Sequence, residues 1–197
     1  MVTSSRKQVT SEKIMDAAIE LFSQYGYDCV TTEEIAKKAG FSEKTLFRHF
    51  KSKQNLLKQA IDRFHYAEEM RLLFERKLSG DLQADLQLIS DNYHRIMYQN
   101  RKMLRVLAKL GGKVPGIHQY ARRHPKQLQQ FLTKYFREMK LQKKLGDVDE
   151  EKAAITFLYL NYGLAQCRIA EEPHFSDEEF PEILKESVAI FTRGVRP

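Results

Sequence analysis

Residues 31–53 read TTEEIAKKAGFSEKTLFRHFKSK, which predicts two short helices joined by a glycine turn. Thr32 can cap the first helix through its hydroxyl, and Glu33 and Glu34 follow in the first turn, where the helix dipole favours negative charge. Gly40 suits the left-handed backbone position that ends many helices. This arrangement is typical of a helix-turn-helix.

The second helix of this pair is expected to present a polar face. Ser42 can cap it, and a rotation of about 100° per residue places Leu46 and Phe50 on the buried stripe. The residues turned most nearly away from that stripe are Lys44, Thr45 and Arg48. An outward face of this kind can enter the major groove of DNA. The alternative interpretation is an ordinary pair of amphipathic helices in a helical protein.

The residues that follow the turn resemble the signature of a known family. The segment TLFRHFKSKQNLL, residues 45–57, is similar to the signature of the tetracycline-repressor (TetR) family of bacterial one-component transcription regulators. In that family the recognition helix reads Thr-Leu-Tyr-x-His-Phe and is followed by a polar pair and a lysine. Upstream, KIMDAAIELF (residues 13–22) and Tyr25-Gly26-Tyr27 resemble the first helix and its glycine stop. The match runs without gaps from about Glu12 to Leu57.

The outward face and the resemblance together give the candidate DNA-contacting residues. They are Thr32, Ser42, Lys44, Thr45, Phe47, Arg48, His49 and Lys53. We expect Lys44 or Arg48 to reach base edges, whereas the resemblance implies backbone contacts for His49, and Lys53 is expected on phosphate. Phe47 departs from the family, which usually has tyrosine here. Because a phenyl ring cannot donate a hydrogen bond to phosphate, the resemblance does not carry that contact over.

Helical periodicity continues through the rest of the chain, without a convincing strand. We expect a first helix over residues 11–26 and one long connecting helix over residues 53–78, which lack Gly and Pro. Further helices are expected over residues 82–97, 103–110, 117–144, 149–170 and 177–193. The predicted fold class is all-α, with an N-terminal three-helix helix-turn-helix domain (residues 1–55) and a C-terminal helical domain for ligand binding and dimerisation (residues 56–197).

Composition excludes several other classes of protein. The chain has 197 residues, a polar N-terminus and no apolar run near the roughly 20 residues that cross a bilayer, so we expect a soluble cytoplasmic protein. Cys29 and Cys167 lack a CxxC partner and are interpreted as packed thiols. The histidines show no metal-ligand spacing, and no nucleophile or phosphate loop stands out. We therefore expect no metal, no cofactor and no enzyme activity.

Positive charge is concentrated in the middle of the chain. Residues 95–145 contain 14 Lys and Arg residues against one acidic residue. Three interpretations are open: a solvated helical face, auxiliary contact with DNA phosphates, or an entrance that attracts an anionic ligand. The residues that would line such an entrance are Arg101, Arg105, Arg122 and Arg123.

These observations predict a DNA-binding transcriptional regulator, and the resemblance implies a ligand-relieved repressor. We expect a homodimer on a palindromic operator, paired through the last two helices. The candidate interface residues are Ala153, Ala154, Phe157, Leu158, Leu160, Ala165, Ile183, Leu184, Val188 and Phe191. A helical protein-interaction module and a helical enzyme without DNA binding are the alternatives.

The effector is expected to lie among large apolar side chains with a few hydroxyl and amide groups. The candidates are Tyr93, Ile96, Met97, Met103, Leu107, Phe131, Tyr135, Phe157 and Asn161. Such a mixture suits a hydrophobic or amphipathic molecule. The basic middle segment favours an anionic or neutral one, such as a fatty acid, an acyl thioester or an aromatic acid.

Overall fold

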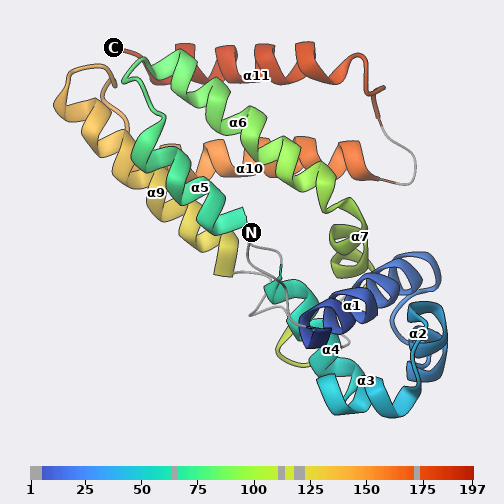
Figure 1. Cartoon of the computed structure of the whole chain (residues 1–197). Helices are drawn as coiled ribbons and strands as arrows, with labels where there is room; N and C mark the ends of the chain where they lie inside the picture. Colours follow the sequence, from blue (N-terminus) through green and yellow to red (C-terminus); the bar gives the residue numbers. More distant parts are fainter. Residues whose placement is uncertain (1–5, 64–65, 111–113, 118–122, 171–173) are drawn as a thin grey trace. The chain divides into compact units, whose positions relative to one another are not determined.

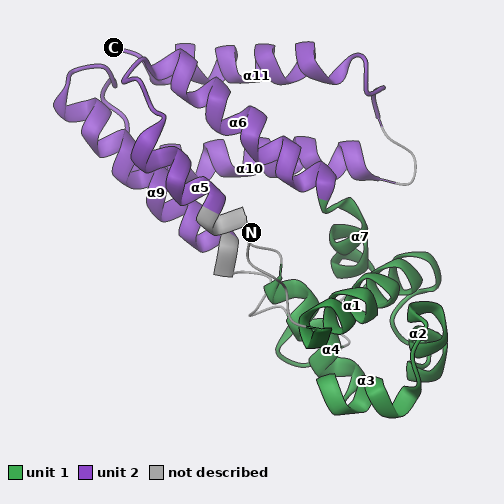
Figure 2. Cartoon of the chain, viewed as in Figure 1, with its two compact units in different colours: residues 1–64, 100–121 green, residues 65–99, 122–197 purple. Residues whose placement is uncertain are grey.

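The computed structural model describes residues 6–63, 66–110, 114–117, 123–170 and 174–197, and within these ranges it contains helices and no strand (Figure 1). The chain forms two compact units (Figure 2). Unit 1 comprises residues 1–64 and 100–121, and unit 2 comprises residues 65–99 and 122–197. No helix in the described ranges is both long and apolar enough to cross a bilayer.

Unit 1 is built around its first helix. Its helices are α1 (Arg6–Tyr25), α2 (Thr32–Ala39), α3 (Glu43–Phe50), α4 (Lys53–Asp62) and α7 (Arg101–Leu110). α1 packs against α2, α4 and α7. Phe22, Leu46 and Phe50 are fully buried in the shared core, because each lies on the apolar stripe of its helix. This core fixes the direction in which α3 presents its other face.

α7 belongs to unit 1 although it lies about forty residues beyond α4 in the chain. Its Met103, Val106 and Leu110 are buried in the core of unit 1. Lys109 Nζ also donates a hydrogen bond to the Ser23 carbonyl, over 3.4 Å. The units are therefore not continuous segments of the chain. Because they are defined by packing and not by function, the functional division at residue 55 stays a prediction.

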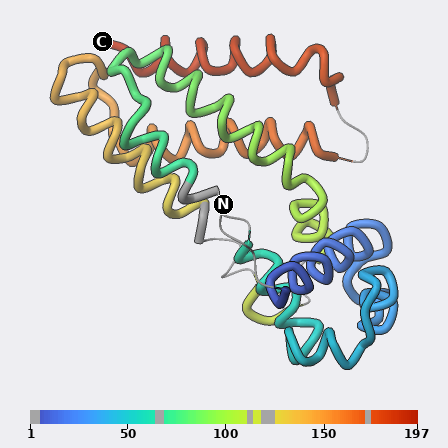
Figure 3. Tube along the Cα trace, in the orientation of Figure 1, coloured from blue at the N-terminus to red at the C-terminus, as the bar shows by residue number. Residues whose placement is uncertain are grey.

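Unit 2 contains α5 (Tyr66–Arg76), α6 (Leu82–Gln99), α9 (Arg123–Leu141), α10 (Glu150–Ile169) and α11 (Phe180–Val195). α9 lies beside α5 and α10, and α6 packs against α10 and α11, as the trace in Figure 3 shows. The core includes a chain of aromatic rings: the Phe157 ring centroid is 4.9 Å from that of Phe191 and 6.5 Å from that of Phe136. These contacts join α9, α10 and α11.

The single connecting helix expected over residues 53–78 is wrong. α4 ends at Asp62, where Arg63 caps it through its backbone N–H, and α5 begins at Tyr66. Residues 64 and 65 lie outside the described part of the chain. The apolar face of α4, including Leu56, is buried in unit 1, whereas Met70 of α5 is buried within unit 2. Burial in two different cores therefore divides a segment that has no sequence breaker.

The ends of α10 and α11 are set by local hydrogen bonds. Asp149 caps α10, since its side chain accepts from the N–H groups of Glu151 and Lys152. α11 begins at Phe180, three residues later than expected, and Asp177 does not cap it. Gly146 donates its N–H to the Val195 carbonyl over 2.8 Å, and a Cβ atom there would lie 2.7 Å from the carbonyl oxygen of residue 196. Only glycine fits this approach.

Candidate DNA interface and effector cavity

A capping box begins the first helix of the helix-turn-helix. Thr31 Oγ1 accepts the Glu34 N–H (3.2 Å), and Glu34 Oε2 accepts the Thr31 N–H (2.7 Å). These bonds hold the pKa of Glu34 below its ordinary value. The cap predicted at Thr32 is therefore wrong by one residue. Thr32 instead donates its hydroxyl to Glu43 Oε1 over 2.6 Å, which joins the start of α2 to the start of α3.

The turn between the helices has the predicted glycine geometry. Gly40 has φ = 78°, and its N–H donates to the Lys37 carbonyl over 3.1 Å. The Phe41 N–H donates to the Ala36 carbonyl over 2.9 Å, which completes a Schellman motif. Ser42 then caps α3, as predicted, by accepting the N–H of residue 45 over 3.3 Å. The two helices are thereby fixed at both sides of the turn.

The outward face of α3 is basic. Leu46 and Phe50 are fully buried beneath it, whereas Lys44 and Arg48 are exposed and Phe47 is 42% exposed. Among the described residues, no carboxylate pairs with Lys44 or Arg48. Both cations are therefore available to a ligand of opposite charge.

Two further candidates on this side are already engaged within unit 1. His49 Nδ1 lies 2.9 Å from Ser11 Oγ of α1, and burial, with the charge of Arg48 adding to it, lowers the pKa of His49. Lys53 Nζ lies 4.3 Å above the Tyr27 ring centroid, and partial burial lowers the pKa of Lys53. Each group is held by a contact with an aromatic ring or with α1, so each is pre-positioned beside α3.

Unit 2 holds a cavity of about 620 Å³ between α5, α9 and the loop before α6. Its apolar wall is aromatic: the Phe74 ring centroid lies 5.6 Å from that of Phe131 and 6.3 Å from that of Tyr135. This volume is typical of small-molecule sites, and the wall suits an apolar ligand body.

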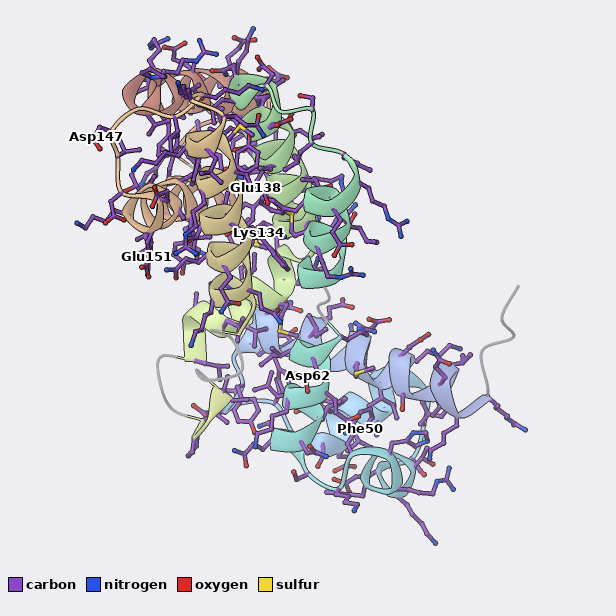
Figure 4. All side chains as sticks on the ribbon, turned by 90° about the vertical axis from the view of Figure 1, so that its left-hand side faces the viewer. Phe50, Asp62, Lys134, Glu138, Asp147 and Glu151 are labelled. Atoms are coloured by element: carbon purple, nitrogen blue, oxygen red, sulfur yellow. The ribbon has the colours of Figure 1, made fainter. Side chains whose placement is uncertain are left out.

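Charged side chains surround the same cavity. Arg71 donates to Glu75 over 2.6 Å, and Lys134 lies 3.9 Å from Glu138, one turn further along α9 (Figure 4). Lys144 donates to the Gly80 carbonyl over 2.5 Å. The lining thus combines an apolar wall with three cations and two carboxylates.

The buried carboxylate of Asp85 lies behind this cavity. Its side chain accepts hydrogen bonds from the Ser79 N–H (2.7 Å), the Ser79 hydroxyl (2.9 Å), the Gly80 N–H (2.8 Å) and the Tyr135 hydroxyl (2.9 Å). Burial, together with the charge of Asp85, raises the pKa of Tyr135. Tyr135 therefore stays protonated and donates. The network fixes the loop before α6 against α9.

A family model for bacterial regulatory proteins of the tetR family matches residues 14–60, which span the capped helices described above. Residues 14–60 therefore belong to the TetR family of DNA-binding domains. The chain is a DNA-binding transcriptional regulator. The chain is 26% identical over 186 residues to the uncharacterized HTH-type transcriptional regulator YvkB of Bacillus subtilis, covering 94% of this chain and 97% of that protein.

Solved structures with the same fold cover nearly the whole TetR-family chain. NalD, the secondary repressor of the MexAB-OprM multidrug efflux pump in Pseudomonas aeruginosa, is similar with a TM-score of 0.75 and 19% identity, covering 95% of each chain. FadR from Bacillus subtilis, solved in complex with stearoyl-CoA, is similar with a TM-score of 0.76 and 16% identity, covering 94% of this chain and 99% of FadR. At these identities the similarity shows the fold.

The structure does not bring the predicted effector residues of this TetR-family chain into one site. Phe131 and Tyr135 line the α5–α9 cavity. The residues buried in the core of unit 2 are Tyr93, Ile96, Met97, Phe157 and Asn161. Met103 and Leu107 instead belong to the core of unit 1. Periodicity assigned them to a buried face but could not say in which core that face lies.

The structure does not test the predicted arginine entrance. Arg101 and Arg105 lie on α7 in unit 1. Arg122 lies outside the described residues, as does the side chain of Arg123. Sequence reasoning also missed Phe74 and Asp85 as parts of the cavity and its support. A lone aspartate among the apolar positions of α6 was the available signal for Asp85.

Most of the predicted dimer residues are buried within one chain. They are Ala153, Ala154, Phe157, Leu158, Ala165, Leu184 and Val188. The exposed apolar and aromatic residues of the same helices are Ile155, Tyr159, Tyr162 and Ile190. The sequence could not separate the buried stripe of α10 from the exposed one, because both are apolar, and the dimer interface itself stays a prediction.

Proposed function

We propose that this TetR-family regulator is a cytoplasmic, ligand-relieved repressor without enzyme activity that binds a palindromic operator as a homodimer. The observation that carries the proposal is the outward face of α3, where two cations without a carboxylate partner among the described residues lie over a fixed apolar base. A helix presented in this way fits the major groove. The repressor assignment is supported by the similarity in fold to NalD, which is a secondary repressor.

We assign the DNA contacts by exposure and by chemistry. Lys44 and Arg48 are positioned to reach base edges, whereas Lys53 is positioned for phosphate, and His49 is held as a neutral hydrogen-bonding group. The remaining contacts proposed for this face are Thr32, Ser42, Thr45 and Phe47. The hydroxyls of Thr32, Ser42 and Thr45 are already engaged with one another or with Glu43, and Phe47 has none, so we expect all four to contribute through shape and backbone position.

Fluorescence anisotropy with a specific operator and a scrambled duplex tests these roles. Lys44→Ala or Arg48→Ala should cost ~1–3 kcal/mol on the operator and relax preference at one base position. Lys53→Ala should weaken both duplexes alike and lower the salt slope by about one. Lys185→Ala, at an exposed lysine of α11, is the charge-matched control. Altered base preference in Lys53→Ala alone would contradict the assignment.

We propose that the homodimer forms through the exposed stripe of α10 and through Ile190 of α11. Ile155, Tyr159 and Tyr162 are spaced at i, i+4 and i+7, so they share one face of α10. Tyr159 is 65% exposed, which is unusual for a large aromatic residue without a partner surface. Light scattering at micromolar concentration should give a dimer, and Tyr159→Arg should shift it toward monomer. A wild-type monomer would contradict the proposal.

We propose that the effector binds in the α5–α9 cavity and is an amphipathic anion or a neutral apolar molecule. The aromatic wall and the three cations support this class, as does the stearoyl-CoA complex of the structural neighbour FadR. Since α5 lines the cavity and α4 is buried in unit 1, a ligand that moves α5 would act through the chain on the DNA-binding unit.

Thermal-shift measurements with stearoyl-CoA, oleate and a cationic dye test the effector class. Stearoyl-CoA and oleate should raise the melting temperature of the protein and release it from the operator. Phe131→Asp should weaken both effects by placing a carboxylate in the aromatic wall of the cavity, whereas Leu141→Asp, at an exposed position at the end of α9, should not. Stabilisation and release by the cationic dye alone would contradict the proposal.

A further inference from the structure

A second, smaller cavity in unit 2 is lined by an arginine that is held between two aromatic rings. The Arg168 guanidinium carbon lies 4.2 Å from the Tyr98 ring centroid and 4.1 Å from the Phe180 ring centroid. Its side chain is only 18% exposed. The rings fix the plane of the guanidinium, so its hydrogen-bonding edge has a defined direction.

A carboxylate of the same chain occupies that edge. Asp177 Oδ1 accepts a hydrogen bond from Arg168 Nε over 2.9 Å, and Asp177 Oδ2 accepts one from the Tyr98 hydroxyl over 3.1 Å. Asp177 itself is 59% exposed, so water can solvate its carboxylate if it leaves. Arg168 and Tyr98 thus form a carboxylate-binding site, and the exposed side chain of Asp177 occupies it.

A buried histidine lines the adjoining cavity, which has a volume of about 410 Å³. His94 is 2% exposed, and among the described residues neither ring nitrogen makes a hydrogen bond of good geometry; the Asn161 side chain, whose Oδ1 is also unpartnered, lies next to the ring. Burial, with the charge of Arg168 adding to it, lowers the pKa of His94 to about 4, so the imidazole is neutral and offers one donor and one acceptor. Asn161 can satisfy one ring nitrogen, which leaves the other for a polar atom in the cavity.

We propose that this cavity binds a small carboxylic acid with an apolar body, and that the acid displaces Asp177. The carboxylate takes the Arg168 and Tyr98 contacts, the apolar body lies against Phe180 and Leu184, and His94 meets a polar atom at the inner end. When Asp177 leaves, the balance of charge at the cavity shifts by one toward positive, which favours an anion. This site is separate from the α5–α9 cavity and does not depend on it.

The position of Arg168 on α10 keeps the site clear of the proposed dimer surface. Arg168 follows Tyr159 by nine residues, which places it roughly 180° around the helix from the exposed stripe. Dimerisation through that stripe would therefore leave the cavity accessible.

Isothermal titration of the full chain with benzoate, in the absence of DNA, tests the proposal. Asp177→Asn should tighten benzoate binding about tenfold, because an internal competitor that fills a site nine-tenths of the time raises the apparent Kd tenfold. Arg168→Gln should weaken binding at least tenfold. Phe131→Asp, which places a carboxylate in the other cavity, should leave binding unchanged, so failure here is distinguishable from failure of the effector proposal.

Two results would overturn the carboxylate site. One is an Asp177→Asn variant that binds benzoate no more tightly than wild type. The other is an Arg168→Gln variant that folds, by circular dichroism, and binds as wild type does. If Arg168→Gln does not fold, the Asp177→Asn comparison decides alone, because Asp177 is exposed and its replacement leaves the core intact.

Discussion

Replacing Tyr135 with phenylalanine removes one hydrogen bond to a buried charge and nothing else. Asp85 is 1% exposed and accepts four hydrogen bonds, of which Tyr135 supplies one at 2.9 Å. A hydrogen bond to a charged group contributes ~1.5–3 kcal/mol. The two backbone N–H groups and the Ser79 hydroxyl remain on the carboxylate, so we expect a loss of about 2 kcal/mol in the free energy of unfolding.

Urea unfolding followed by circular dichroism measures this loss at an unchanged m-value. Tyr25→Phe is the matched control, because Tyr25 is 58% exposed and its replacement should stay within ~0.5 kcal/mol of wild type. The double variant Asp85→Asn/Tyr135→Phe should show a coupling energy of about 1 kcal/mol or more. A loss below ~0.5 kcal/mol in Tyr135→Phe, or additive single variants, would refute the reasoning.

Three further variants test the fold. Gly146→Ala should cost ~1–3 kcal/mol, because the new methyl group would lie 2.7 Å from a backbone oxygen; an unchanged melting temperature would contradict this close approach. Burial holds the pKa of His94 at about 4, so as pH falls from 6.5 the unfolded chain takes up the proton first. Wild type should therefore lose about 3 kcal/mol of its free energy of unfolding by pH 4, whereas His94→Phe should not. Parallel pH profiles of urea unfolding for the two proteins would argue against this. Ser42→Ala should lose about 1 kcal/mol, since the N–H of residue 45 loses its cap, and equal urea midpoints would show that the cap is dispensable.

The helix-turn-helix could be predicted because short-range interactions determine it. Gly40 and Ser42 act through their own backbone and neighbours, so their roles follow from residue type and spacing. The cap at the start of α2 was misplaced because two adjacent threonines can each cap a helix. The spacing of three residues between Thr31 and Glu34 would have identified the correct one.

The arrangement of the rest of the chain depends on contacts between distant residues. Met103 reads as a buried position, but only packing reveals that α7 completes unit 1. No glycine or proline in the sequence marks the break between α4 and α5. Residue 177 was the expected start of the last helix, whereas the structure pairs Asp177 with Arg168, and Ser176 and Glu179 hydrogen-bond each other just before α11. Periodicity identifies faces, and it does not identify their partners.

Selection of bound duplexes from a random DNA pool tests the central claim that α3 reads DNA sequence. Wild type and the double variant Lys44→Ala/Arg48→Ala are selected in parallel, with Lys185→Ala as the control. We predict that wild type and the control enrich one palindromic motif and that the double variant loses preference at specific positions of each half-site. Enrichment of the same motif by the double variant, or no motif with wild type, would contradict the account.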